Sequence, residues 1–207
     1  MFVYVFVYGR VTIFSSSNFN AMPEFDHLSI QTGRLLLRPL NESDAPAIFA
    51  IRSNATVMRY HTSLPWTDTN LAVALIARDM AAMQSGEYLH LGLERLEDHA
   101  LIGTCTLFDF NKQCRRAEVG YELRHEEWGK GYMHEALVAL LKYGFSTLML
   151  NRIEADIHPD NIGSAKSLER LGFQKEGYLR ERWIVGDETS DSALYGLLHS
   201  DWQALHP

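Results

Sequence analysis

Residues 124–137 read Arg-His-Glu-Glu-Trp-Gly-Lys-Gly-Tyr-Met-His-Glu-Ala-Leu, and this stretch is the strongest indication of the fold. A strand-like run, residues 117–123, leads into it, and apolar residues at helical spacing follow from Ala136 to Phe145. The two glycines, one residue apart, let the backbone adopt φ > 0 and approach a ligand closely. Because the helix N-terminus adds free N–H groups and a partial positive charge, the turn predicts a site for a phosphate or pyrophosphate.

A second stretch, residues 161–173, reads Asn-Ile-Gly-Ser-Ala-Lys-Ser-Leu-Glu-Arg-Leu-Gly-Phe and also follows a strand. Hydrophobic and charged residues alternate over residues 152–157, which is typical of a half-buried strand. Asn161 is suited to cap the helix that follows, and Gly172 is suited to end it. Two strand-to-helix units are therefore predicted in succession.

Together the two stretches closely resemble the GNAT acetyltransferase superfamily, in particular the branch of the RimJ and RimL protein N-terminal acetyltransferases. The shared elements are a Glu-hydrophobic-Gly-Tyr strand at 118–121, Trp-Gly-x-Gly-Tyr at 128–132, Glu135-Ala136, Asn161 with Ser164, and Leu-Gly-Phe at 171–173. Residues 32–40 fit the opening of the same family, and the resemblance spans roughly residues 28–202.

Composition sets independent bounds on the class of protein. With 207 residues, of which 46% are hydrophobic and 22% charged, the chain predicts one globular domain with a substantial core. The net charge of −7 argues against nucleic-acid binding and is compatible with a cationic substrate such as a protonated amine. Cys105 and Cys114 are too few for a disulfide framework, so two reduced cysteines in a cytoplasmic protein are expected.

The first residues differ from the rest of the chain. Residues 1–8 are apolar and β-prone, but the run is too short to span a membrane and lacks the basic start of a signal peptide. A polar, linker-like stretch, residues 15–20, then precedes Met22. We expect residues 1–21 to be an appendage to a domain formed by residues 22–207 that starts at Met22; a membrane tether or an extra edge strand is the alternative.

Two helices are predicted in the N-terminal part of the domain, after a strand at residues 34–39. Asn41 is expected to cap a helix that runs to about Arg52. The second helix starts at Thr67 or Thr69 and ends at Gly86. Its expected buried stripe includes Leu71, Ala74, Leu75, Ala77 and Met80.

Strand patterns fill much of the remaining chain. Residues 88–93, 101–110 and 117–123 predict three successive antiparallel strands, and two more strands are expected near residues 177–184 and 192–198. With the two strand-to-helix units, this order predicts a mixed α/β sheet with helices on both faces.

The resemblance implies the GNAT fold, an α/β (α+β) domain with a mixed, mostly antiparallel central sheet and a splayed pair of parallel strands. Acetyl-coenzyme A (acetyl-CoA) is then expected in the V between those strands, with its pyrophosphate on the amides of residues 128–133. Exposed strand backbone at residues 122–124 is expected to pair with the pantetheine amides. The residues expected to bind acetyl-CoA are Leu123, Arg124, Trp128, Gly129, Lys130, Gly131, Tyr132, Met133, Asn161 and Ser164.

One residue of the turn departs from the family pattern. Glu126 stands where many members carry Gln or Arg, and a carboxylate beside a pyrophosphate is unfavourable. We therefore expect the turn to bind the pyrophosphate through main-chain N–H groups. The alternative is that the side chain of Glu126 points into solvent. Lys130 is expected either to add a cation or to be a solvated turn lysine.

Acyl transfer to an amine requires a base, because a protonated amine has no lone pair. Glu118 is the candidate base; alternatively it is an outward-facing residue or a salt-bridge partner of Arg115 or Arg116. A backbone N–H near Leu123 or Arg124 is expected to polarise the thioester carbonyl.

The second strand-to-helix unit supplies the remaining candidates. Ser164 is expected to donate to the coenzyme sulfur, or else to be a capping hydroxyl, and Asn161 to hold the pantetheine arm. Glu181 is a reserve base, and a water-mediated base is also open. His158 is expected to bind substrate or relay a proton, or else to be a turn residue. The nine histidines form no cluster with carboxylates at metal spacing, so no metal is expected.

The predicted function is therefore direct transfer of acetyl from acetyl-CoA to a primary amine. The RimJ/RimL resemblance implies a protein or peptide N-terminal α-amine, whose reference pKa of about 7.7–8.0 makes it easier to deprotonate than lysine. A small amine, such as a polyamine or an aminoglycoside-like compound, is the alternative acceptor. A non-catalytic CoA-binding regulatory domain is the alternative class, and a nucleotide-binding protein is disfavoured because no P-loop pattern is present. A homodimer through the C-terminal strands is compatible with the sequence.

Overall fold

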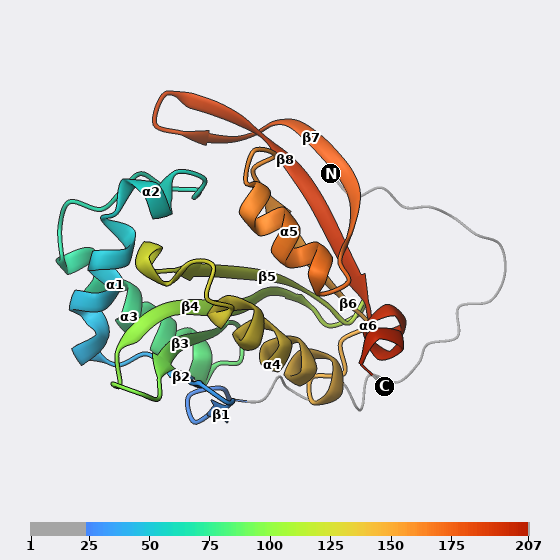
Figure 1. The fold of residues 1–207 in the computed structure, drawn as a ribbon, viewed down its shortest axis with the longest axis horizontal. Helices are drawn as coiled ribbons and strands as arrows, with labels where there is room; N and C mark the ends of the chain where they lie inside the picture. The colour runs from blue at the N-terminus through green and yellow to red at the C-terminus, as the bar shows by residue number, and fades with distance from the viewer. Residues whose placement is uncertain (1–23, 207) are drawn as a thin grey trace, which may run out of the picture.

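The computed structural model describes residues 24–206, which form one eight-stranded sheet in the order β1-β2-β3-β4-β5-β6-β8-β7 (Figure 1). The appendage expected at residues 1–21 lies outside the described residues. The strands are β1 (Ile30–Gln31), β2 (Leu35–Pro39), β3 (Leu89–Arg95), β4 (Leu101–Asn111), β5 (Arg116–Leu123), β6 (Arg152–Ile157), β7 (Gln174–Val185) and β8 (Glu188–Leu198). The helices are η1 (Glu42–Asp44), α1 (Ala45–Arg52), α2 (Ala55–Met58), α3 (Asn70–Gln84), η2 (His125–Glu127), α4 (Tyr132–Ser146), α5 (Ile162–Arg170) and α6 (His199–Leu205).

The predicted mixed, mostly antiparallel sheet is confirmed. Neighbouring strands from β1 to β5 are antiparallel, as are β6 with β8 and β7 with β8. Only β5 and β6 are parallel, and they pair over three positions, from Arg116↔Arg152 to Glu118↔Glu154. Since β5 continues to Leu123 and β6 to Ile157 without further pairing, the two strands separate beyond Glu118, as the splayed pair requires.

Each face of the sheet carries its own hydrophobic core. Ile102 contributes to the large core with α4 and α5, whereas its neighbour Leu101 contributes to a smaller core with α1 and α3. Adjacent residues of a strand point to opposite faces, so the helices cover both faces, as predicted. Figure 1 shows α4 and α5 on one side of the sheet and α1 with α3 on the other.

The buried stripe predicted for the helix after Thr69 is wrong except at Leu75. The buried residues of α3 are Ala72, Leu75, Ile76, Asp79 and Met83. Leu71 and Met80 are instead 44% and 49% exposed. The buried face includes a carboxylate because Asp79 Oδ2 lies 2.6 Å from Nδ1 of His90 on β3, a partner that local periodicity does not reveal.

The helix predicted after Asn41 is present with a different first turn. Asn41 and Asp44 form a capping box, as the start signal required, but the first turn is the 3₁₀ helix η1 and the α-helix begins at Ala45. The short helices α2 and α6 were not predicted; each has fewer than eight residues, too few to show a helical period.

Candidate active site

The glycine turn between β5 and α4 has the backbone conformation that its sequence predicts. Gly129 has φ 75° and Gly131 has φ 81°, and Gly131 is the N-cap of α4. The first helical bond runs from the Glu135 amide to the Gly131 carbonyl at 3.1 Å. Within residues 24–206, the amides of residues 129–134 donate to no protein acceptor, so they are available to an anion at the helix N-terminus.

Trp128 does not offer its amide to that site, contrary to the expectation. Its amide donates to the carbonyl of His125 at 3.1 Å, and its indole Nε1 donates to the carbonyl of Leu123 at 2.9 Å. Trp128 therefore closes the turn against the end of β5. The available amides are therefore those of residues 129–134 instead of the expected 128–133, because the first turn of α4 also includes the amide of His134.

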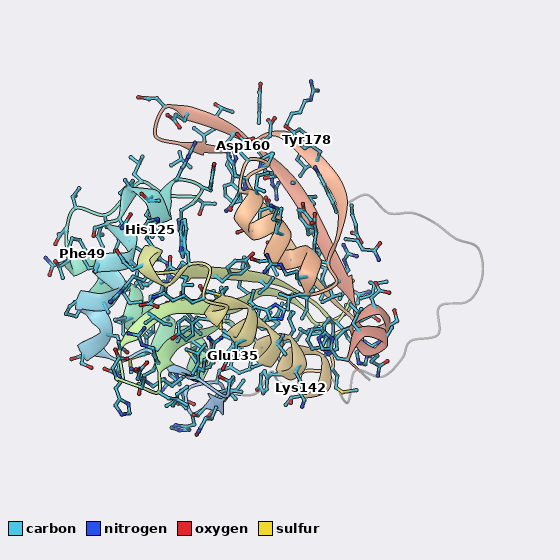
Figure 2. All side chains as sticks on the ribbon, viewed as in Figure 1. Phe49, His125, Glu135, Lys142, Asp160 and Tyr178 are labelled. Carbon is cyan, nitrogen blue, oxygen red and sulfur yellow. The ribbon has the colours of Figure 1, made fainter. Side chains whose placement is uncertain are left out.

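Arg34, which precedes β2, holds the glycine turn in place. Its Nη1 donates to the Lys130 carbonyl at 2.9 Å, and its guanidinium carbon lies 4.4 Å from the ring centre of Tyr132. Its Nε and backbone amide donate to Glu135 at 2.6 and 2.7 Å, and the Thr32 hydroxyl donates to the same carboxylate at 2.6 Å. Figure 2 shows Glu135 at the start of α4. These donors hold the pKa of Glu135 below its usual value against the opposing effect of burial.

The charged residues of the turn are arranged so that no carboxylate competes with the amides. Glu126 is exposed, whereas Glu127 is buried and paired with Arg95 at 3.0 Å and with Lys130 at 2.9 Å. Lys130 is thus held by Glu127, and the main-chain N–H groups are the donors that remain available.

The end of β5 presents backbone groups to the gap between the splayed strands. The Arg124 amide donates to the Ile102 carbonyl on β4 at 2.8 Å, so it cannot polarise a thioester as the sequence suggested. Amides alternate in direction along a strand, and those of Tyr121 and Leu123 therefore point away from β4, to the side that β6 leaves open. The amide of Leu123 remains the candidate oxyanion donor.

Helix α5 lines the other side of this gap. The side-chain oxygen of Asn161 accepts the Ser164 amide at 3.1 Å, so Asn161 is the cap of α5. The Ser164 hydroxyl makes no hydrogen bond to another described residue and is not itself the cap. Tyr121 from β5 lies beside it, with its hydroxyl 3.5 Å from the Ser164 carbonyl. Burial raises the pKa of Tyr121 to about 12, so its phenol stays protonated.

Glu118 lies on the opposite face of β5 from Tyr121, at the last pair before the strands separate. It is half-buried and lies within salt-bridge distance of no described cation; Arg116 pairs instead with Glu154 at 2.5 Å. Burial raises the pKa of Glu118, and the negative charges of Asp109, Asp156 and Glu154 raise it further. A half-buried carboxylate with a raised pKa is suited to accept a proton near neutral pH.

A cavity of about 510 Å³ opens on this face of the sheet. One wall is the loop of residues 58–65 after α2, and the other is the tip of the β7–β8 hairpin, residues 183–191. A Cβ at Gly186 in the hairpin would lie 3.6 Å from Leu64, which shows how closely the two walls approach. Asp156 and His158, at the end of β6, form the part of the lining nearest the splayed strands. Figure 1 shows the hairpin extending toward α2.

An ion-pair network that the sequence did not indicate fixes the loop wall. The carboxylate of Glu122 on β5 is buried and accepts Nε of Arg52 at 2.9 and 3.0 Å. His61 in the loop lies 3.7 Å from the same carboxylate, and burial lowers the pKa of His61. Glu122 is therefore engaged in holding α1 and the loop against β5.

The two reserve residues differ in their positions. Glu181 is exposed on the edge strand β7, and its amide donates to Asp191 at 2.7 Å. His158 lines the cavity with its ring 4.9 Å from that of Tyr60. The structure thus places His158 at the cavity and leaves Glu181 on the outer edge.

A splayed parallel strand pair beside a glycine-rich helix N-terminus is the architecture of a coenzyme A-dependent acyltransferase. The chain belongs to the GNAT acetyltransferase family: residues 34–174 match the model of the acetyltransferase (GNAT) domain. The uncharacterized N-acetyltransferase YoaA of Bacillus subtilis (strain 168) is 36% identical over 169 residues, 82% of this chain and 96% of YoaA. The crystal structure of a GNAT-family acetyltransferase from Bacillus anthracis matches with a TM-score of 0.75 at 25% identity, covering 84% of this chain and 99% of that one.

Two further relatives have a named acceptor. The [ribosomal protein uS5]-alanine N-acetyltransferase of Escherichia coli (strain K12) is 32% identical over 120 residues, 58% of this chain and 62% of that protein. The spermidine N(1)-acetyltransferase of Vibrio cholerae is 26% identical over 174 residues, 82% of this chain and 95% of that protein. The protein is thus an acetyl-CoA-dependent N-acetyltransferase, and its relatives include enzymes for both kinds of amine.

The residues of this chain fit acetyl-CoA. A Cβ added at Gly129 would meet no atom within 4 Å, so the surface over the turn is open for a diphosphate, and the amides beneath it donate to no described protein acceptor. Among the described residues, no three His, Cys, Asp or Glu side chains are grouped closely enough to hold a metal ion. In the same part of the chain, every helix is too short or too polar to cross a membrane.

Proposed function

We propose that this enzyme acetylates the N-terminal α-amine of a protein or peptide. The observation that carries the proposal is the position of the cavity between residues 58–65 and 183–191, which opens beside the splayed strands on the face that carries Glu118. A cavity on this face admits an extended chain end while the opposite face binds the donor. The identity to the uS5-alanine N-acetyltransferase and the RimJ/RimL-like sequence elements support an α-amine acceptor.

Each residue of the site has a role in this proposal. The amides of residues 129–134 hold the diphosphate, and the backbone of Leu123 pairs with the pantetheine arm and polarises the thioester carbonyl. Glu118 removes a proton from the incoming ammonium, directly or through water. Ser164 donates to the departing sulfur from the other face, and Asn161 positions Ser164 as the cap of α5. Acetyl-CoA supplies the activated acyl group as a thioester.

A polyamine is the second candidate acceptor, because of the charges in the cavity. Among residues 24–206, four carboxylates line it, those of Asp156, Asp187, Glu188 and Asp191, and Arg59 is the one Arg or Lys side chain in the lining. An acidic lining attracts a substrate that carries several ammonium groups. The spermidine N(1)-acetyltransferase relative supports the same reading.

Thiol release distinguishes these acceptors. The purified chain would be assayed with acetyl-CoA and peptides that start with Ala, Ser or Met, and with spermidine and free lysine. The proposal expects kcat/KM to be highest for one of the peptides, with acetylation at the α-amine shown by mass spectrometry. A preference for spermidine would replace the acceptor, and no release with any amine would overturn the proposed function.

A further inference from the structure

Asp156 is placed where the two splayed strands part. It lies two residues after Glu154, which is the last residue of β6 to pair with β5. Side chains two apart on a strand share a face and are about 7 Å apart. Asp156 is therefore on the same face as Glu118 and Glu154, one step farther toward the open end of the V.

The carboxylate of Asp156 is largely buried, and one of its two oxygens has no partner among the described residues. Its side chain is 13% exposed, and within the described chain its Oδ1 atom is buried and has no hydrogen-bond partner. Its other oxygen lies 3.6 Å from Nε of Arg182, whose side chain is 52% exposed on the edge strand β7. A buried carboxylate oxygen with no donor is costly for the folded protein, so such an atom is expected to serve a bound group.

The charged groups around Asp156 allow a cation to reach its carboxylate from the side of the cavity. Nε of Arg182 on β7 lies 3.6 Å from Asp156, and the charge of Asp156 acts on Glu118 on β5. The cavity lining adds Arg59, His61, His158, Asp187, Glu188 and Asp191. Burial lowers the pKa of His61, so His61 does not supply a positive charge near neutral pH.

We propose that Asp156 is a positioning residue: its carboxylate binds the ammonium group of the acceptor and places it within reach of Glu118. This inference rests on the proposed function, since it assigns the acceptor end of the same site, but it holds for an α-amine and for a polyamine alike. The carboxylate at the mouth of the V binds the charged form of the amine, which predominates at neutral pH. Its negative charge also makes Glu118 a stronger base.

The proton and electron balance is simple. The bound ammonium gives one proton to the Glu118 carboxylate, and the nitrogen then has the lone pair that forms the C–N bond. The C–S bond breaks with its electron pair on sulfur, which takes a proton from the side of Ser164. The nitrogen loses its second proton as the C–S bond breaks, and this proton replaces, through water, the one that Ser164 gave to the sulfur. Glu118 returns its proton to solvent, so one amide, one thiol and one proton leave for each ammonium consumed.

The test compares Asp156→Asn with Arg182→Gln in the full chain, using the acceptor that the wild type prefers. Asparagine keeps the shape of Asp156 and removes its charge. We expect the acceptor KM to rise by about 10- to 100-fold, which corresponds to the loss of one hydrogen bond to a charged group. The kcat measured at high pH and the KM for acetyl-CoA should both stay within about threefold of the wild-type values. The acid limb of the kcat/KM profile should also move to lower pH, because the Asp156 charge raises the pKa of Glu118.

Two further variants separate this role from a structural one. Arg182→Gln should leave the acceptor KM unchanged or lower it. Asp156→Glu keeps the charge, so the acid limb of its kcat/KM profile should stay at the wild-type pH. Its acceptor KM should lie between those of the wild type and Asp156→Asn. An unchanged acceptor KM and acid limb in Asp156→Asn, with the wild type active, would overturn the inference and leave the proposed function standing. An equal rise of KM in Arg182→Gln would show that the ion pair matters only for the fold, and a wild type inactive toward every amine would remove both proposals.

Discussion

Replacing Gly129 by alanine separates the glycine's role in binding from its role in folding. Gly129 has φ 75°, a conformation that costs a residue with a Cβ about 1–2 kcal/mol. Alanine also lowers the conformational entropy of the unfolded chain, which stabilises the folded state by about 0.4–1 kcal/mol. A Cβ at this position meets no atom within 4 Å, so no steric term is added. The net loss of stability should be about 1 kcal/mol, or a fall of about 2–4 °C in Tm.

The effect on coenzyme A binding should be larger than the effect on stability. The Cβ would project into the open space over the amides of residues 129–134, where the diphosphate has to approach the backbone. Loss of one hydrogen bond between an amide and a charged phosphate costs about 1.5–3 kcal/mol, so Kd should rise by roughly 10- to 150-fold. Isothermal titration with CoA and thermal unfolding followed by circular dichroism measure the two effects independently.

Gly186→Ala is the matched control for this variant. Gly186 has φ 61° in the turn between β7 and β8, and its added Cβ would make only an ordinary contact with Leu64, at 3.6 Å. It should lose about the same stability, about 1 kcal/mol, and bind CoA as the wild type does. If Gly129→Ala bound CoA with unchanged affinity while losing as much stability as Gly186→Ala, the glycine would serve the backbone alone and the argument for the amide site would fail.

Three other substitutions test the remaining roles. Glu118→Gln should lower kcat/KM by about 10²- to 10⁴-fold. It should not lower Tm at neutral pH, because a carboxyl whose pKa is raised by folding destabilises the folded state when ionised; a lower Tm with normal activity would contradict the base assignment. Ser164→Ala should lower kcat by about 10²-fold, at the low end for acid catalysis because a thiolate leaves readily, and CoA titration should show an unchanged Kd. Glu135→Ala should cost about 2 kcal/mol in urea unfolding at pH 7, since the carboxylate accepts from Thr32 and Arg34. The pKa of Glu135 is lowered by folding, so this difference should shrink as pH falls below about 4.3; a constant difference would refute the ionic account.

The donor half of the site was predictable because its signals are local. Glycines at positive φ, an Asn cap and the start of α4 each depend on a few consecutive residues, and the structure has all three where the sequence placed them. The same sequence could not show that the amides of Trp128 and Arg124 are occupied. Their acceptors are the carbonyls of His125 and Ile102, and the second of these depends on the register of β4 against β5.

The acceptor half was not predictable, because it depends on contacts between distant segments. The cavity forms where the loop after α2 meets the β7–β8 hairpin, and the hairpin pairing shifts register between Leu179 and Trp183. The burial of Asp156 depends on where β5 leaves β6, which no local pattern encodes. The misplaced stripe of α3 has the same cause: a helix rich in alanine, leucine and methionine has no clear apolar side until the partner of Asp79 is known.

The register of β5 assigns the two reactants to opposite faces of the sheet. Because side chains alternate, Glu118 lies on the sheet face on which the cavity opens, while Tyr121 faces α5 and Ser164. Because amides also alternate, the amide of Arg124 that pairs with Ile102 leaves that of Leu123 directed into the V. A slip of one residue would move Glu118 to the donor face and turn the Leu123 amide toward β4, so base and oxyanion donor would be lost together. In the proposed mechanism, the long antiparallel ladder between β4 and β5 therefore fixes in one step which groups face the amine and which face the thioester.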